Sequence, residues 1–481
     1  MKITKHIVII CLVLVSLFSC NDNEFLDISP STETPEQALS SPTAATELVN
    51  AIYNKLLDWN IGGFAWIGVS SITTDNADKG SDPGDTGADK HLLDDLTFSP
   101  SSESFNAVWE GNYQGIARAN QALKFLPELS IDEGLKNRLI GESKFLRGFL
   151  YFQLVRMFGG VPLIKKVPNI QNQHDIDLAN TRATKQEIYN LIIEDLSEAS
   201  ENLPIQYDSN NIGRVTKGAA LTLLAKVHMY LGNWQNVKDL TTQVMGLGYS
   251  LTPDYSTIWR ETAENNEESI FEIQGRGETP NQGVVGYFIT QGARGAGGWG
   301  WGFNTPTEDL VNAYEVNDLR KDATIIFRGE TLWDNLYVPN TVSNPRYNEK
   351  AYISKTNETY NGNDWETNKN VRVLRYAEVL LMNAEAALEV GGETATPLNE
   401  VRHRAGLGDA PIIDKLAIWK ERRLELAMEH DRYFDLVRQG RAGEVLRAHG
   451  KNFIDGKHEL FPIPQAQIDL SGGLLTQNPG Y

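Results

Sequence analysis

The chain has 481 residues, with 44 Lys and Arg against 63 Asp and Glu, and a formal net charge of −19. Hydrophobic residues make up 41% and charged residues 22%, which excludes a disordered or fibrous protein and is enough to build a large core. The acidic balance argues against nucleic acid as a partner, because surfaces that bind nucleic acid are rich in Lys and Arg.

The N-terminus has the pattern of an exported bacterial lipoprotein. Lys2 and Lys5 precede an apolar run at residues 7–18, which is too short to span a bilayer but fits the core of a secretory signal. The next motif resembles a lipobox, with a phenylalanine bulkier than usual: Leu17-Phe18-Ser19-Cys20. We expect removal of residues 1–19 and lipidation of Cys20. The alternative is a plain signal peptide with an incidental cysteine.

The cysteine count agrees with a lipid anchor. Of the two cysteines, Cys11 lies in the segment expected to be removed, so a mature chain that begins at Cys20 forms no internal disulfide. Each buried acyl CH₂ contributes about 0.8 kcal/mol, so several acyl chains together anchor a protein firmly. Removal of Lys2 and Lys5 makes the chain still more acidic, which leaves the acyl chains to hold it at a membrane.

Most of the mature chain is predicted to be helical, in pairs joined by short turns. Start signals include Pro35 in a first helical turn, Asp132 as a cap, and a capping box from Thr184 to Glu187. The expected helices cover residues 34–58, 103–126, 132–157, 184–203, 216–231, 234–245, 371–390, 398–405 and 412–439. This pairing favours a mostly α fold with a tetratricopeptide-like helical scaffold.

Two long irregular inserts, at about residues 60–100 and 247–370, interrupt a scaffold of about 34–58, 102–246 and 371–440. They are rich in Gly, Asn, Asp, Thr and aromatic residues and contain only short strand-like runs, such as 270–273 and 324–327. Irregular segments of this length are uncommon in a compact domain unless they carry function. We therefore expect one domain over residues 20–481, with a binding site in the inserts.

The first insert offers an indole and clustered oxygen atoms. Trp66 precedes Asp75, Asn76 and Asp78, whose side-chain oxygens suit sugar hydroxyls. Calcium also prefers such ligands, but the spacing does not match the loop of paired-helix calcium sensors, so no metal is predicted. A solvated acidic loop is the other alternative.

The second insert offers two tryptophans in a glycine-rich loop. Residues 292–302 contain six glycines together with Trp299 and Trp301. Glycine supplies no apolar neighbours, whereas flat indole faces suit the C–H faces of sugar rings. We expect one or both tryptophans to bind ligand. The alternative for each tryptophan is that its side chain is buried in the core under the loop. If the site lies elsewhere in this insert, the candidate aromatic residues are Tyr287, Trp333 and Trp365.

Catalytic and cofactor motifs are absent from the sequence. There is no His-Glu-x-x-His, no Gly-x-Ser-x-Gly, no phosphate-binding loop and no cysteine pair for zinc. Residues 295–300 formally match Gly-x-Gly-x-x-Gly, but Pro306 and Thr307 place the next helix too late for a dinucleotide site. Near the C-terminus, Arg422, Glu425 and Glu429 stand at helical spacing, which predicts structural ion pairs along one face and ionised carboxylates.

Several blocks resemble the SusD/RagB family of outer-membrane lipoproteins, in the family's order and across the chain from Cys20 to Tyr481. The matching blocks are Phe145-Leu146-Arg147-Gly148-Phe149-Leu150-Tyr151-Phe152, Phe158-Gly159-Gly160-Val161-Pro162-Leu163, Arg375-Tyr376-Ala377-Glu378, Asn399-Glu400-Val401-Arg402-His403-Arg404-Ala405-Gly406, the run 421–438, and Phe461-Pro462-Ile463-Pro464 with Asn478-Pro479-Gly480-Tyr481. The stretch after Cys20, Asn21-Asp22-Asn23-Glu24, resembles the acidic surface-export signal of Bacteroidetes lipoproteins.

The resemblance implies a cell-surface lipoprotein of the outer membrane that binds glycans without cleaving them. It further implies delivery to a SusC-like TonB-dependent transporter as partner, no cofactor, and ligand platforms in the inserts. Two alternatives stay open: a peptide-binding lid of the same kind of transporter, and an exported glycoside hydrolase with a pair of carboxylates roughly 5–10 Å apart. The family blocks belong to the scaffold, so they do not identify the glycan.

Overall fold

A computed structural model describes residues 41–82, 84–85, 88–277, 283–294 and 300–481. The predicted signal peptide, Cys20 and Trp299 lie outside these ranges. The long helices of the scaffold are α4 (Pro42–Leu56), α8 (Glu103–Phe125), α9 (Glu133–Phe158), α11 (Lys185–Asn202), α12 (Lys217–Tyr230), α13 (Trp234–Met245), α17 (Tyr376–Val390), α18 (Ala395–Arg404) and α19 (Lys415–Glu425).

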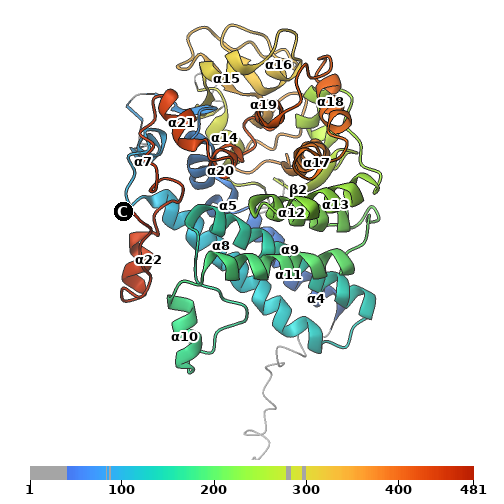
Figure 1. The fold of residues 1–481 in the computed structure, drawn as a ribbon, viewed down its shortest axis with the longest axis vertical. Helices are drawn as coiled ribbons and strands as arrows, with labels where there is room; N and C mark the ends of the chain where they lie inside the picture. The colour runs from blue at the N-terminus through green and yellow to red at the C-terminus, as the bar shows by residue number, and fades with distance from the viewer. Residues whose placement is uncertain (1–40, 83, 86–87, 278–282, 295–299) are drawn as a thin grey trace, which may run out of the picture.

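Successive scaffold helices pack on one another along the chain. The order of contact is α4, α8, α9, α11, α12, α13, α17, and then α18 and α19. In Figure 1, α8, α9 and α11 lie side by side below α12, α13 and α17, while α15 and α16 of the second insert form the opposite end. One large apolar cluster runs through the scaffold and includes residues from Ala45 to Leu475. The mostly α, repeat-like scaffold predicted from the sequence is confirmed.

Local sequence signals set the ends of several helices. Asp132 accepts a hydrogen bond from the backbone N–H of Leu135 and begins α9, and Thr216 caps α12 in the same way. The predicted capping box at α11 is complete, because Thr184 and Glu187 each bind the other's backbone N–H. Such side chains satisfy amide groups that the first helical turn leaves without partners, which is why these starts were predictable.

Shorter helices and turns connect or extend the scaffold. They are α5 (Trp59–Gly62), α6 (Phe64–Ile67), the π-helical turn η1 (Gly68–Ile72), α7 (Ala88–Asp94), η2 (Leu126–Glu128), α10 (Gln173–Asn180), η3 (Tyr255–Trp259), η4 (Glu261–Ala263), α14 (Tyr287–Gln291), α15 (Glu308–Ala313), α16 (Arg320–Thr324), η5 (Glu349–Ala351), α20 (Arg432–Arg438), α21 (Ala442–Ala448) and α22 (Gln465–Leu470).

The strands of the described residues form three antiparallel pairs. β1 (Ala77–Gly80) pairs with β3 (Phe303–Pro306), β2 (Ser269–Ile273) with β6 (Val371–Arg375), and β4 (Ile325–Phe327) with β5 (Arg346–Asn348). The two strand-like runs predicted at 270–273 and 324–327 are confirmed as β2 and β4. The pair β1–β3 joins the first insert to the second.

Two predicted helices are wrong in part. Residues 371–375 form strand β6, and the helix begins only at Tyr376, because this segment pairs with β2. The predicted helix 412–439 is broken between α19 and α20. Met428 and His430 adopt left-handed backbone angles there, with φ of 67° and 73°, which ends helical periodicity.

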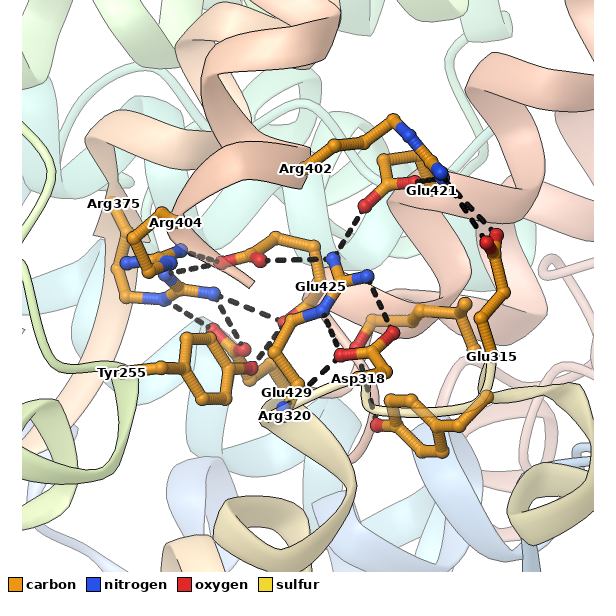
Figure 2. A network of polar contacts seen from close by, with 12 residues as sticks. Tyr255, Glu315, Asp318, Arg320, Arg375, Arg402, Arg404, Glu421, Glu425 and Glu429 are labelled. Carbon is orange, nitrogen blue, oxygen red and sulfur yellow. Dashed lines mark hydrogen bonds and ion pairs between the residues drawn. The ribbon is translucent and has the colours of Figure 1, made fainter. Parts of the chain in front are cut away.

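The break in that helix points Glu425 and Glu429 toward arginines of other segments. Glu425 lies within 2.9 Å of Arg375, 2.5 Å of Arg404 and 3.3 Å of Arg320, and all four side chains are buried (Figure 2). Burial by itself would raise the pKa of Glu425, but the three guanidinium groups outweigh it and hold that pKa well below its usual range. The predicted ionised, structural role is confirmed, whereas the predicted pairing along one helix face is wrong.

Further ion pairs extend this network to the second insert. Arg320 also pairs with Asp318 at 2.7 Å and with Glu421 at 2.6 Å, and Arg402 bridges Glu421 at 3.0 Å to Glu315 at 3.1 Å (Figure 2). These contacts join the insert around α16 to α18 and α19. The charged run near the C-terminus therefore holds the second insert on the scaffold.

Candidate functional site

Three tryptophans from distant parts of the sequence form one cluster at the surface. The ring centroids of Trp301 and Trp365 are 5.0 Å apart, those of Trp59 and Trp365 are 5.8 Å apart, and those of Trp59 and Trp301 are 6.1 Å apart. Trp365 is 47% exposed, and the other two are half-buried. We call Trp59, Trp301 and Trp365 the tryptophan cluster.

Two phenylalanines extend the tryptophan cluster toward β3. Phe64 contacts Trp59 and Trp301 edge-on, with centroids 5.9 and 6.2 Å apart, and Phe303 lies 4.6 Å from Phe64. The Lys90 ammonium group stands 4.3 Å from the Phe64 ring centroid, a cation–π contact on the buried side. Trp59 and Trp301 therefore pack on Phe64, which in turn packs on Phe303.

Backbone contacts fix each tryptophan of the cluster. Asp58 caps α5 and so sets Trp59 at its first position. Gly286 adopts a left-handed conformation (φ 70°), and a Cβ there would lie 2.1 Å from the Trp59 ring, so only glycine allows this approach. The N–H of Gly286 donates to the carbonyl of Trp365 at 2.9 Å, and that of Trp301 donates to Ile289 at 2.8 Å.

A polar group lies directly beside Trp301. The Ser81 hydroxyl is 2.9 Å from the Trp301 carbonyl oxygen, and the Ser81 N–H donates to the next carbonyl, of Gly302, at 2.5 Å. The Arg294 guanidinium lies 2.8 Å from Asp82 and also pairs with Asp85. Hydroxyl, carboxylate and guanidinium groups thus stand next to the Trp301 backbone, and sugar recognition uses such polar groups together with aromatic faces.

A small cavity opens on the Trp365 side of the cluster. Its wall includes Lys355, Asp364 and Tyr360, and the remaining lining residues are Phe288, Ile289, Gly292, Ala351, Ile353 and Thr367. Lys355 pairs with Asp364 at 2.8 Å, and its ammonium group lies 4.7 Å from the Tyr360 ring centroid. The cluster therefore has polar side chains on both sides.

Of the predicted site residues, Trp301 belongs to this cluster. Trp299 lies in the segment 295–299, outside the described residues. Asp78 lies on β1 with a half-exposed side chain, 3.6 Å from the His449 imidazole. The aromatic candidate Trp365 joins the cluster, whereas Tyr287 is buried against His430.

Burial corrects the expected exposure of three other site residues. Trp66 is 8% exposed and stacks on Phe434, with ring centroids 6.0 Å apart.

The side chain of Asp75 is fully buried. Burial would raise its pKa, but a bidentate pair with Arg432 at 2.8 Å and a contact with Arg423 hold the pKa well below its usual range. Asn76 is 2% exposed and accepts a hydrogen bond from Arg423. These three residues pack within the scaffold.

Sequence reasoning missed Trp59, and it did not foresee that Asp82 and Asp85 of the acidic stretch pair with Arg294. The available signal for Trp59 was its place directly after the capping residue Asp58, where the predicted helix ends and the first insert begins. For Asp82 and Asp85 the signal was their place in the same acidic stretch as Asp78. Their pairing with a residue more than 200 positions away is not visible in sequence.

Neither a metal-binding cluster nor a membrane-spanning helix is present among the residues that the structure describes. No group of three or more His, Cys, Asp or Glu side chains there is arranged to hold a metal ion. Within the same ranges, no helix combines the length and the apolar character needed to cross a membrane.

Two family models match the chain in succession. Residues 24–231 match the model described as "Starch-binding associating with outer membrane", and residues 267–481 match the SusD family model. Together they cover the first insert, most of the second insert and most of the scaffold, and leave residues 232–266 unmatched.

Similar proteins include known glycan binders. A laminarin-binding SusD-like protein is 30% identical, with a TM-score of 0.80 over 91% of this chain and 99% of that one. Surface glycan-binding protein A from Bacteroides thetaiotaomicron, solved with laminarihexaose, is 25% identical, with a TM-score of 0.77 over 91% and 99%. SusD-like protein P2 of Formosa agariphila is 27% identical over 99% of this chain and all of its own length.

Proposed function

The chain belongs to the SusD family, and we propose that it is a cell-surface protein that binds glycans at the tryptophan cluster without cleaving them. The observation that carries this proposal is the convergence of Trp59, Trp301 and Trp365, from three separate segments, beside hydroxyl and carboxylate groups. Flat indole faces with polar neighbours suit sugar rings. Laminarin, which a similar protein binds, is the first ligand to test.

Ion pairing with arginine makes two buried carboxylates, Glu425 and Asp75, unsuitable as the general acid of a hydrolase. A glycosidase needs one carboxylic acid with a raised pKa near an ionised partner. Glu425 and Asp75 have lowered pKa values and direct ion pairs with arginines. Neither carboxylate suits the role of general acid.

The purified protein is expected to bind a neutral glycan on an oligosaccharide array and to release no sugar from it. Binding is read on the array and confirmed by calorimetry, and release is read as new reducing ends after prolonged incubation with the bound glycan. A catalytically competent glycosidase specific for the same glycan serves as positive control. Release of oligosaccharide that disappears when one acidic residue is replaced would contradict the proposal.

We further propose that Cys20 carries the lipid anchor and that the protein delivers glycan to a SusC-like TonB-dependent transporter. The family model that describes outer-membrane association supports this location. Cys20→Ala is expected to give an exported, folded protein in the soluble fraction, because several acyl chains supply the membrane affinity. The measurement is fractionation of cells that lack the transporter. Retention of the variant in the outer membrane would contradict the anchor, and Cys11→Ala is the matched control.

A further inference from the structure

Three cations around the tryptophan cluster, Arg294, Lys355 and Lys90, are each paired with carboxylates. Arg294 lies beside Trp301, since a Cβ at the next residue, Gly302, would come within 3.0 Å of the Arg294 Cβ. Its Nε is 2.8 Å from Asp82, and its Nη1 pairs with Asp85. Arg294 and Asp82 are partly exposed, with 37% and 44% of their side-chain surfaces accessible, so a bound ligand can reach both.

The same pairing occurs on the other two sides. Lys355 pairs with Asp364, the residue before Trp365, at 2.8 Å. Lys90, against Phe64, pairs with Asp89 at 3.0 Å. Lys79 stands 5.5 Å from the Phe303 ring centroid, so four cations and four carboxylates surround the aromatic surface as a whole. The imbalance lies beside Trp301, where two carboxylates flank one guanidinium and the local charge is negative by one unit.

This arrangement has a direct consequence for the ligand's charge. A sulfate or uronate group needs a cation whose charge is not already balanced, and next to Trp301 it meets one guanidinium and two carboxylates. A neutral sugar hydroxyl fits the same groups, because it can accept from the guanidinium and donate to a carboxylate. Proteins commonly exclude an unwanted ligand by placing a group of the same charge against it, here a carboxylate against a sulfate or uronate.

We propose that the site selects uncharged glycans. Asp82 and Asp85 enforce this selection, because their two negative charges exceed the single positive charge of Arg294 beside Trp301. The inference rests on the proposed function and deepens it by naming the class of ligand. It assigns Asp82 and Asp85 a role in specificity, whereas stacking on the indoles supplies most of the affinity.

The test compares one oligosaccharide in two charge states. Laminarihexaose and the same compound after chemical sulfation are titrated into the unmodified protein and into Asp82→Asn/Asp85→Asn. The unmodified protein is expected to prefer the neutral probe by about tenfold or more. The double variant should shift the ratio of the two affinities by about tenfold toward the sulfated probe, and this shift should weaken as salt is raised.

Two control variants assign the effect to Arg294. Adding Arg294→Ala to the double variant is expected to abolish the shift, whereas adding Arg276→Ala, at an exposed arginine outside these pairs, should leave it intact. Equal or tighter binding of the sulfated probe by the unmodified protein overturns the inference while leaving the proposed function standing. Binding of no glycan on a mixed neutral and anionic array overturns the proposed function, and the inference with it.

Discussion

Trp301→Ala and Trp365→Ala are each expected to weaken glycan binding by about 5- to 150-fold. The reason is loss of a stacking face, since burying a large apolar side chain contributes about 1–3 kcal/mol. Trp365 is 47% exposed, so its replacement removes little from the core. Calorimetry with the tightest-binding array glycan measures the change, and the melting temperature reports whether each variant stays folded.

Trp333→Ala is the matched control for both variants. Trp333 is also exposed, at 39%, but lies outside the tryptophan cluster, with the Arg260 guanidinium 4.3 Å from its ring centroid. We expect its replacement to leave affinity unchanged. If Trp333→Ala weakens binding and both cluster variants bind normally, the glycan site lies around Trp333.

Glu425→Ala is expected to lower the free energy of unfolding by about 3–5 kcal/mol, the range for removing one partner of a buried ion pair. The substitution leaves Arg320, Arg375 and Arg404 buried around a missing charge (Figure 2). Urea unfolding followed by circular dichroism measures the effect. The second insert is expected to loosen first, because Arg320 belongs to it.

Asp455→Ala provides the control for that experiment. Asp455 pairs with Arg447 at 3.0 Å, but both side chains are largely exposed, so solvent screens the pair and its loss should have little effect. A Glu425→Ala variant as stable as Asp455→Ala would show that the buried network does not hold the insert.

Elements governed by local signals could be predicted from the sequence. The starts of α9, α11 and α12 follow from capping residues, and β2 follows from a short apolar run between turn residues. The break after α19 could not be predicted. It depends on the left-handed residues Met428 and His430, which let Glu429 meet Arg375 at 2.8 Å, a partner 54 positions away.

The candidate site was predictable from the sequence only where one segment carried the whole signal. Trp301 stood out because glycines surround it. Trp59 did not, because its role depends on contact with Trp301 and Trp365, which only the fold brings together. Asp75 looked like a free acceptor, but Arg432, its partner, is 357 residues away in sequence.

The most direct test of glycan binding at the tryptophan cluster is a crystal structure of the protein with laminarihexaose or with the tightest-binding array glycan. Our account predicts a sugar ring stacked on Trp301 or Trp365, with its hydroxyl groups within hydrogen-bond distance of the group formed by Ser81, Asp82 and Arg294. A glycan bound with full occupancy at a place that touches none of the three tryptophans would contradict it.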